Sequence, residues 1–351
     1  MRKSRLLLAP LAALGLVVAA CGGDDGGSSS ETQAPAETEA PAGSSCDLVG
    51  GVAFDTGGRG DGTFNDSAGQ GADRAMSELG IDVKELEANV DEDRKANLEL
   101  LVEGGASVIV GVGFMFTDPM TEVALANPDI TFGIVDSVVD APNVRNLVFA
   151  EEQGSFLVGA AAALKSESGK IGFIGGQEID LIKKFEAGYI AGAKHINPDI
   201  VVESKYLGPA GDNSAWGNVA GAKEIASGWF ADGADIVYTA AGGSGAGTIE
   251  AAVEAGKWAI GVDSDQYLTA GSEDQKAHIL TSMLKRVDVA VFETMKAACE
   301  GDTSGGIKVF DLSNDGVGYS TSGGYVDDIA AQLDELKAEI VSGAITVPTA
   351  P

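Results

Sequence analysis

Residues 170–196 read KIGFIGGQEIDLIKKFEAGYIAGAKHI. After the lysine, residues 171–174 form a short run without the alternation of apolar and polar residues that a half-exposed strand shows. Such a run is typical of a strand that is buried on both faces of a parallel sheet. Residues 179–196 place apolar side chains at helical spacing, so the stretch predicts a buried strand followed by a helix.

The same order of strand and helix recurs on both sides of this stretch. We expect further strands at 48–54, 107–112, 131–135, 200–206, 236–238 and 258–262, and an extended piece at 279–282. We expect helices at 65–79, 91–103, 120–126, 154–164, 219–230, 248–255, 284–299 and 329–342. This alternation predicts an α/β fold whose mostly parallel sheets are covered by helices on both faces.

The chain has 351 residues, which is too long for one simple α/β layer and fits two lobes. Two runs of strands and helices in series predict two doubly wound parallel-sheet lobes, with a crossover at 146–152. We expect residues 46–150 plus 279–310 to form lobe 1. Residues 151–278 plus 311–351 are expected to form lobe 2.

The first 45 residues have the pattern of an export signal and a tether. A basic start and a short apolar stretch predict a signal peptide at 1–20, because a membrane span needs a longer apolar run. Cys21 follows small residues, as in the bacterial lipobox, which implies cleavage before Cys21 and its lipidation, as with palmitate. An ordinary signal peptide with an incidental cysteine is the alternative. Residues 21–45 then form a lipidated, flexible linker, and we expect a lipid-anchored protein on the extracytoplasmic face of the cell membrane.

The remaining cysteines are Cys46 and Cys299. An exported chain meets an oxidising compartment, so the two thiols could form a disulfide or stay free. The two histidines, His195 and His278, lie far apart and lack the spacing of metal ligands. We therefore expect neither a metal site nor a cofactor.

The chain carries 53 acidic and 23 basic residues, and its formal net charge is −30. Such a surface repels phosphate backbones, which argues against a nucleic-acid partner. The acidity fits general solubility, or a salty or acid setting, better than a specific acidic docking surface.

Polar and aromatic residues follow several of the expected strands, where an open parallel sheet binds its ligands. Asp55, Asp136 and Asp263 each come directly after a strand, and carboxylates suit vicinal hydroxyls or the N–H groups of a base. A lone aspartate in this position can instead cap a helix. Phe64 and Asn65 end a glycine-rich loop; Phe64 offers a flat face to a ring, or folds back into the core.

Residues 241–247 read AGGSGAG and open a helix. They complete neither a P-loop nor the GxGxxG motif, so the glycines, Gly243 among them, are expected to allow a close approach of backbone to an uncharged ligand. Lys285 is expected to begin the helix 284–299, either on the surface or reaching the cleft.

Several motifs together resemble one family. They are GDGTFNDSAGQG (60–71), VGVGFMFTDPM (110–120), FGIVDS (132–137), YTAAGGSGAGTIEAA (238–252), AIGVDSDQ (259–266) and ILTSMLKRVDVAV (279–291). In order and spacing they resemble the basic membrane lipoprotein family over about residues 48–347. This resemblance implies a substrate-binding protein of an ABC importer that binds purine or pyrimidine nucleosides, with an ABC permease and ATPase as partners.

The resemblance also implies a fold like the type I periplasmic binding proteins, with two lobes that close on the ligand across three hinge crossings. Carried over motif by motif, it implies roles in stacking on the base (Phe64, Tyr238), hydrogen bonding to the base (Asn65, Asp136), holding the ribose (Asp263, Gly243, Lys285), forming the floor (Asp55) and forming outer walls (Phe114, Phe185). Trp216 departs from the family's usual tryptophan turn, and the sequence gives it no role.

Other classes of function remain as alternatives. A pentose-like sugar receptor would use the same carboxylates and one aromatic face, and a ligand sensor for a membrane signalling protein would share the whole fold. No nucleophile elbow and no cluster of catalytic histidines favours an enzyme. We expect a monomeric binding protein; the sequence decides neither the nucleoside nor the permease.

Overall fold

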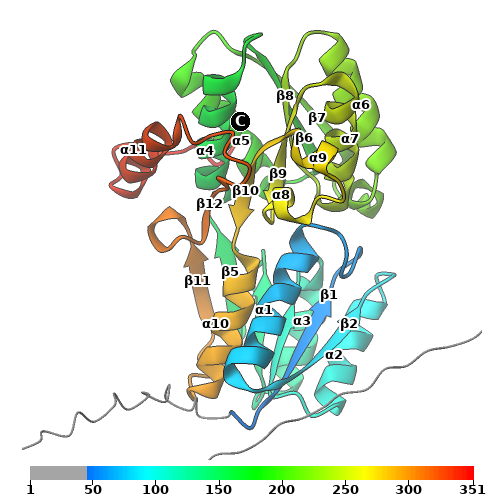
Figure 1. Ribbon diagram of the computed structural model, residues 1–351. Helices are drawn as coiled ribbons and strands as arrows, with labels where there is room; N and C mark the ends of the chain where they lie inside the picture. Colours follow the sequence, from blue (N-terminus) through cyan, green and yellow to red (C-terminus); the bar gives the residue numbers. More distant parts are fainter. Residues whose placement is uncertain (1–45) are drawn as a thin grey trace, which may run out of the picture. The chain divides into compact units, whose positions relative to one another are not determined.

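The computed structural model describes residues 46–351 of the chain. The predicted signal peptide, Cys21 and the linker lie outside the described residues. Two lobes, each built on a six-stranded sheet, make up the described part (Figure 1). The predicted α/β class with two parallel-sheet lobes is therefore confirmed.

The sheet of lobe 1 has the strand order β11-β5-β4-β3-β1-β2, and all its neighbours pair in parallel. Its strands are β1 (Val49–Phe54), β2 (Asp82–Glu87), β3 (Val108–Gly111), β4 (Thr131–Val135), β5 (Val144–Phe149) and β11 (Gly306–Phe310). Helices α1 (Phe64–Leu79) and α10 (Val287–Cys299) pack together on one face. Helices α2 (Asp93–Glu103) and α3 (Thr117–Ala126) cover the other face.

The sheet of lobe 2 has the order β12-β10-β9-β8-β6-β7, in which only β12 runs antiparallel to its neighbour. Its strands are β6 (Lys170–Glu178), β7 (Val201–Pro209), β8 (Ile236–Ala240), β9 (Trp258–Asp263), β10 (Ile279–Lys285) and β12 (Val317–Tyr319). The helices are α4 (Glu151–Lys165), α5 (Asp180–Ile196), α6 (Val219–Ala231), α7 (Gly245–Ala255), α8 (Gln266–Thr269), α9 (Glu273–Lys276) and α11 (Ala330–Val341). Short 3-10 turns are η1 (Phe114–Phe116), η2 (Asn213–Trp216), η3 (Gly242–Ser244) and η4 (Leu312–Asn314).

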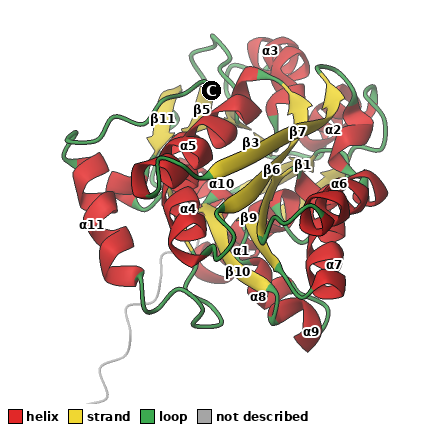
Figure 2. Ribbon diagram, turned by 90° about the horizontal axis from the view of Figure 1, so that it is seen from above, coloured by secondary structure: helices red, strands yellow, loops and turns green. Residues whose placement is uncertain are grey.

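Both faces of each central strand are buried, which is why these strands read as continuous apolar runs. Every residue of β3, β4 and β8 is buried. Alternate side chains of a strand enter different core clusters; Val52 and Ala53 of β1, for example, face opposite helix layers. Figure 2 shows helices on both sides of the strands.

Three strands that lie at sheet edges are not predicted from the sequence. They are β2, β11 and β12, each of which is short or exposes much of one face and so lacks a continuous apolar run. The crossover expected at 146–152 is wrong for its first half: β5 extends to Phe149 between β4 and β11, and α4 begins at Glu151.

The predicted lobe boundary at 278/279 is also wrong. β10 pairs with β9 and β12, so residues 279–285 belong to the sheet of lobe 2. Leu284 and Lys285 extend the strand by pairing with Gly318 and Val317, and α10 begins only at Val287. The chain thus passes between the lobes after β5, after β10 and after β11. Among the described residues, no helix combines the length and apolar character needed to cross a bilayer.

Cys46 and Cys299 form a disulfide with their Cα atoms 5.5 Å apart. The bond joins the residue near the start of β1 to the last residue of α10, and it closes a loop of 253 residues in sequence separation. It therefore ties the first strand of lobe 1 to a helix that the chain reaches only after passing through lobe 2.

Replacing both cysteines by serine is expected to lower the free energy of unfolding by about 2–4 kcal/mol. Without the cross-link, the unfolded chain has a higher conformational entropy and is therefore more favoured. Urea denaturation of the Cys46→Ser/Cys299→Ser variant and of the oxidised parent measures this difference. The parent in reducing agent serves as the control and is expected to match the variant; equal stability of all samples would contradict the prediction.

Candidate ligand-binding site

The carboxyl ends of the two sheets border one cavity of about 260 Å³. This volume lies near the lower end of small-molecule sites, roughly 300–1,000 Å³. Of the residues predicted for the site, those that line the cavity are Asp55, Phe64, Asn65, Asp136, Gly243, Asp263 and Lys285, together with Phe114 and Phe185. The structure thus brings together side chains that are far apart in sequence.

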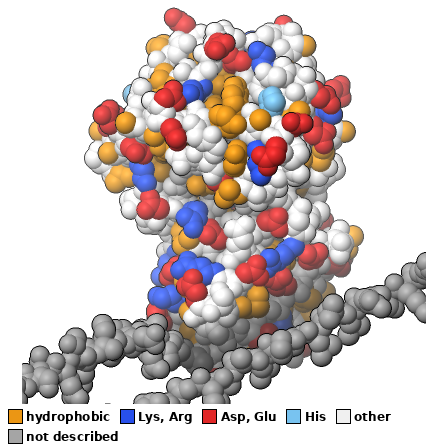
Figure 3. Space-filling view, in the orientation of Figure 1, with side chains coloured by type: hydrophobic (Ala, Val, Ile, Leu, Met, Phe, Trp, Pro, Cys, Tyr) orange, Lys and Arg blue, Asp and Glu red, His pale blue; other side chains and the backbone are white. Residues whose placement is uncertain are grey.

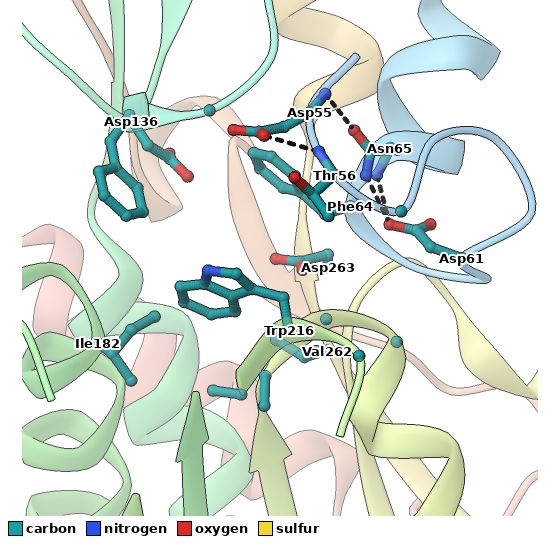
Figure 4. A pocket seen from close by; sticks show the side chains of 18 of the residues that line it. Asp55, Thr56, Asp61, Phe64, Asn65, Asp136, Ile182, Trp216, Val262 and Asp263 are labelled. Atoms are coloured by element: carbon teal, nitrogen blue, oxygen red, sulfur yellow. Dashed lines mark hydrogen bonds between the residues drawn. The ribbon is translucent and has the colours of Figure 1, made fainter. Parts of the chain in front are cut away.

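Two aromatic residues enter the cavity from different lobes. Phe64 begins α1 in lobe 1, and Trp216 ends the turn η2 in lobe 2. In Figure 4 the two rings lie apart across an open space, with the carboxylate of Asp263 between them. Phe114 of lobe 1 contacts Trp216 edge-on, with ring centroids 6.4 Å apart.

A network of hydrogen bonds fixes the loop before α1. Asp61 accepts from the backbone N–H of Thr63 at 2.8 Å and of Asn65 at 2.9 Å, and so caps the start of the helix. The Asn65 side chain donates to Asp61 at 3.1 Å and accepts from the backbone N–H of Asp55 at 3.3 Å. Asn65 therefore has one amide N–H left for a ligand, and its plane is set in advance.

Asp55 is held by a buried arginine. Its Oδ1 accepts from Arg94 Nη2 at 2.7 Å and Nε at 3.0 Å, and both side chains are almost fully buried. The pair is charge-compensated, so Asp55 contributes a neutralised floor to the cavity rather than a free carboxylate.

Lys285 carries a buried ammonium at the seam of the two lobes. Its Nζ lies 2.6 Å from Asp136 Oδ2 and 3.4 Å from Glu151 Oε1. Burial opposes the charged form of Lys285, but the neighbouring carboxylates raise its pKa above the usual range, so it remains an ammonium. The ammonium also lies 5.2 Å from the centre of the Phe64 ring and 5.6 Å from that of Phe185.

Asp136 keeps one oxygen for a further partner. Its Oδ1 is buried and accepts no hydrogen bond from the described residues. Burial raises the pKa of Asp136 to about 6, although Lys285 acts in the opposite direction. A buried acceptor without a donor is costly, so this oxygen is suited to an N–H or O–H group of a ligand.

Of the carboxylates that line the cavity, Asp263 has the fewest stabilising partners in the protein. Burial raises its pKa to about 7, with Lys285 opposing the shift and Asp136 adding to it. Asp263 and Asp136 both have positive φ angles, 62° and 65°, which L-residues rarely adopt outside special sites. Both residues lie at the end of a strand and line the cavity.

Trp216, and not Tyr238 as predicted, is the aromatic residue of lobe 2 whose ring lines the cavity beside Phe114. The prediction that Tyr238 faces the ligand is wrong: it is fully buried, packs on Phe173 and Tyr189, and does not line the cavity. It lies in the middle of β8, so its side chain enters the core rather than the strand-end crevice. The tryptophan ring instead lies against the backbone of Gly176, where a Cβ atom would come within 2.3 Å of it.

The charges of the cavity disfavour anionic ligands. Asp55 is already paired with Arg94, and the other lining carboxylates (Asp61, Asp136 and Asp263) outnumber the one lining ammonium, Lys285. A phosphate group would meet like charge and find the ammonium already paired. Acidic side chains are also spread over both lobes in the view of Figure 3. No group of metal-ligating side chains occurs within residues 46–351.

Comparison with known proteins identifies the family of the chain. The family model described as "ABC transporter substrate-binding protein PnrA-like", Bmp, matches residues 49–350. The chain belongs to the Bmp family. The resemblance predicted from the motifs is thereby confirmed, and the protein is an ABC transporter substrate-binding protein, a class that acts with a ligand and with permease and ATPase subunits.

Two relatives of known name align over most of their length. The CD4+ T-cell-stimulating antigen of Listeria monocytogenes is 34% identical over 369 residues, covering 100% of this chain and 99% of the relative. The "ABC transporter nucleoside-binding protein BmpA" of Lactococcus lactis subsp. cremoris is 34% identical over 324 residues, covering 86% and 90%.

Solved structures show the same fold. An ABC transporter solute-binding protein from Aeropyrum pernix matches with a TM-score of 0.73 and 28% identity, over 86% of this chain and 93% of that one. A carbohydrate-binding protein from Agrobacterium radiobacter, solved with D-arabinose, matches with a TM-score of 0.56 and 19% identity, over 82% and 98%. The second likeness shows the fold alone.

The raised pKa of Asp263 predicts that the stability of this Bmp-family protein depends on pH. Because its folded-state pKa of about 7 lies above the ordinary value of 3.8, the folded protein holds a proton that the unfolded chain has released. Between these two pKa values, the free energy of unfolding of the ligand-free protein is expected to fall as the pH rises. The total decrease is about 2–4 kcal/mol. The measurement is urea denaturation at pH 4.5–8.5 of the parent and of Asp263→Asn.

The amide of the Asp263→Asn variant does not titrate, so the difference in unfolding free energy between the two proteins isolates the carboxylate. As the pH rises towards 7, the parent is expected to lose stability relative to Asp263→Asn, and above pH 7 the difference is expected to level off. A difference that is independent of pH would show that Asp263 has an ordinary pKa.

Proposed function

We propose that this protein is an extracytoplasmic, lipid-anchored receptor that captures nucleosides for an ABC importer. The observation that carries the proposal is the pair of aromatic rings, Phe64 and Trp216, that face one cavity from different lobes with Asp263 between them. Two flat apolar faces suit a nucleobase, and a carboxylate suits the adjacent hydroxyls of a ribose.

The polar groups of the cavity support the same assignment. The free Asp136 oxygen and the remaining amide N–H of Asn65 supply an acceptor and a donor for the edge of a base. The backbone of Gly243 and the ammonium of Lys285 also line the cavity, and we assign them with Asp263 to the ribose side. The excess of carboxylates favours an uncharged nucleoside over a nucleotide.

Binding here is a matter of closing the lobes, not of bond breaking. The ligand bridges groups from both lobes, so it stabilises the closed arrangement that a permease recognises. Support for the ligand class comes also from the Lactococcus lactis relative, whose name describes it as nucleoside-binding.

The proposed location is based on residues 1–45 of the chain. The basic start, the apolar stretch and Cys21 support export and a lipid anchor at the extracytoplasmic face of the cell membrane. A tether of residues 22–45 would leave the two lobes free to approach the permease. We propose that the receptor acts as a monomer, since one chain supplies both walls of the cavity.

Two neighbouring aspartates test the ribose assignment. Asp263→Ala is expected to weaken inosine binding about 10- to 100-fold, because a buried hydrogen-bonding carboxyl group is lost. Asp265→Ala is the matched control and is expected to stay within about threefold, since Asp265 does not line the cavity and accepts from Ser320 and Ser322, each at 2.6 Å. Calorimetry with inosine, guanosine, adenosine, cytidine and uridine measures both variants; equal losses would refute the assignment.

Free ribose and product analysis separate the alternatives. Ribose that binds while every nucleoside fails would replace the proposed ligand with a sugar. Release of free base during incubation with a nucleoside would make the protein an enzyme.

The aromatic assignment is tested by a second pair of variants. Trp216→Ala is expected to weaken nucleoside binding about 5- to 100-fold, the usual range for loss of one stacking face. Tyr238→Phe is expected to leave the affinity unchanged, because it removes only a hydroxyl in the core, 3.4 Å from Ser155 Oγ. Calorimetry at pH 7.5 compares the two, and a larger loss in Tyr238→Phe would reverse the assignment.

A further inference from the structure

A chain of hydrogen bonds joins the two lobes through two residues that do not line the cavity. The turn η2, which ends in Trp216, begins with Asn213 in lobe 2. The Asn213 side chain donates from Nδ2 to Asp91 Oδ1 of lobe 1 at 3.1 Å. Neither Asn213 nor Asp91 lines the cavity.

The direction of this hydrogen bond is fixed from within lobe 2. The backbone N–H of Gly211 donates to Gln177 Oε1 at 2.9 Å, so the Gln177 amide must present its NH₂ group on the other side. That group donates to Asn213 Oδ1 at 3.0 Å, and Gln177 is 1% exposed. Asn213 is therefore left with its NH₂ group facing lobe 1, where the Asp91 carboxylate, whose side chain is 73% exposed, accepts from it.

Lobe 1 supplies the acceptor through a buried arginine. Arg94 Nη1 donates to Asp91 Oδ1 at 2.7 Å, while Nη2 and Nε hold Asp55 at the cavity floor. Arg94 also lowers the pKa of Asp91, through its hydrogen bond and its charge, so the acceptor stays ionised. The relay thus runs from the floor of the cavity, across the seam, to the turn that carries its aromatic wall.

From this geometry we infer that Asp91 and Asn213 form a latch, which holds the Trp216 turn against lobe 1 in the closed form and slows the escape of the ligand. The latch rests on the proposed function only in that a ligand occupies the cavity. Asn213 and Asp91 are positioning residues: they act through Trp216 and Arg94 and contact no ligand. Opening the lobes must break this bond, so it affects dissociation more than association.

A charge exchange tests the latch. Asn213→Asp places a second carboxylate beside Asp91 and is expected to raise the dissociation rate constant of inosine about tenfold. Asp91→Asn alone is expected to change it less than about threefold, because the asparagine oxygen still accepts from both Arg94 and Asn213. The double variant restores a donor and an acceptor, now reversed, and is expected to return to within about threefold of the parent.

Stopped-flow tryptophan fluorescence measures these rates, since Trp216 lies in the cavity. Asn127→Ala is the matched control: its amide donates to Val123 O within lobe 1, and the variant is expected to release inosine at the parent rate. Rescue by the double variant supports the latch. An unchanged dissociation rate in Asn213→Asp would overturn the latch. A double variant that still releases inosine as fast as Asn213→Asp would also overturn it, because the faster release would then come from damage to the turn and not from the lost hydrogen bond.

The outcome is separable from that of the proposed function. If ribose but not inosine binds the parent protein, the nucleoside proposal fails. The same four variants measured with ribose then decide the latch, because neither Asp91 nor Asn213 lines the cavity.

Discussion

The structure depends on one buried charge. The ammonium of Lys285 is almost fully buried at the end of β10, and a buried charge is tolerated only when it is paired. Its partners are Asp136, from the end of β4 in lobe 1, and Glu151, at the crossing into lobe 2. The pairing therefore requires the carboxyl ends of both sheets to meet, and it places the hinge beside the cavity.

This requirement accounts for the strain at the neighbouring strand ends. Asp136 and Asp263 adopt positive φ angles that cost free energy unless the surroundings impose them. Asp136 gains its pairing with Lys285 in return, while Asp263 gains no comparable partner from the protein. The asymmetry is informative: the residue whose strain and burial are least compensated is the one that a ligand can compensate most.

Much of this arrangement could be predicted from the sequence. Strands buried on both faces appear as apolar runs, and the residue after such a strand reaches the crevice, so position alone identifies Asp55, Asp136 and Asp263. Edge strands such as β2 and β11 carry no such run, because one face or one edge stays in water. The sequence indicates Lys285 as a site residue but assigns it to a helix, since its strand is extended by pairing with β12, a contact distant in sequence.

Trp216 and Tyr238 show where local reasoning fails. Tyr238 is two residues short of the end of β8, and the pairing of β8 with β6 and β9 at this level directs it into the core. Trp216 reaches the cavity from a turn whose course depends on Gln177 and on the bare backbone of Gly176. Those contacts join residues about 40 positions apart, so no window along the chain could reveal them. The aromatic wall of the cavity is thus a tertiary property: its ring is placed by a glycine that makes room and by an amide relay that sets the turn.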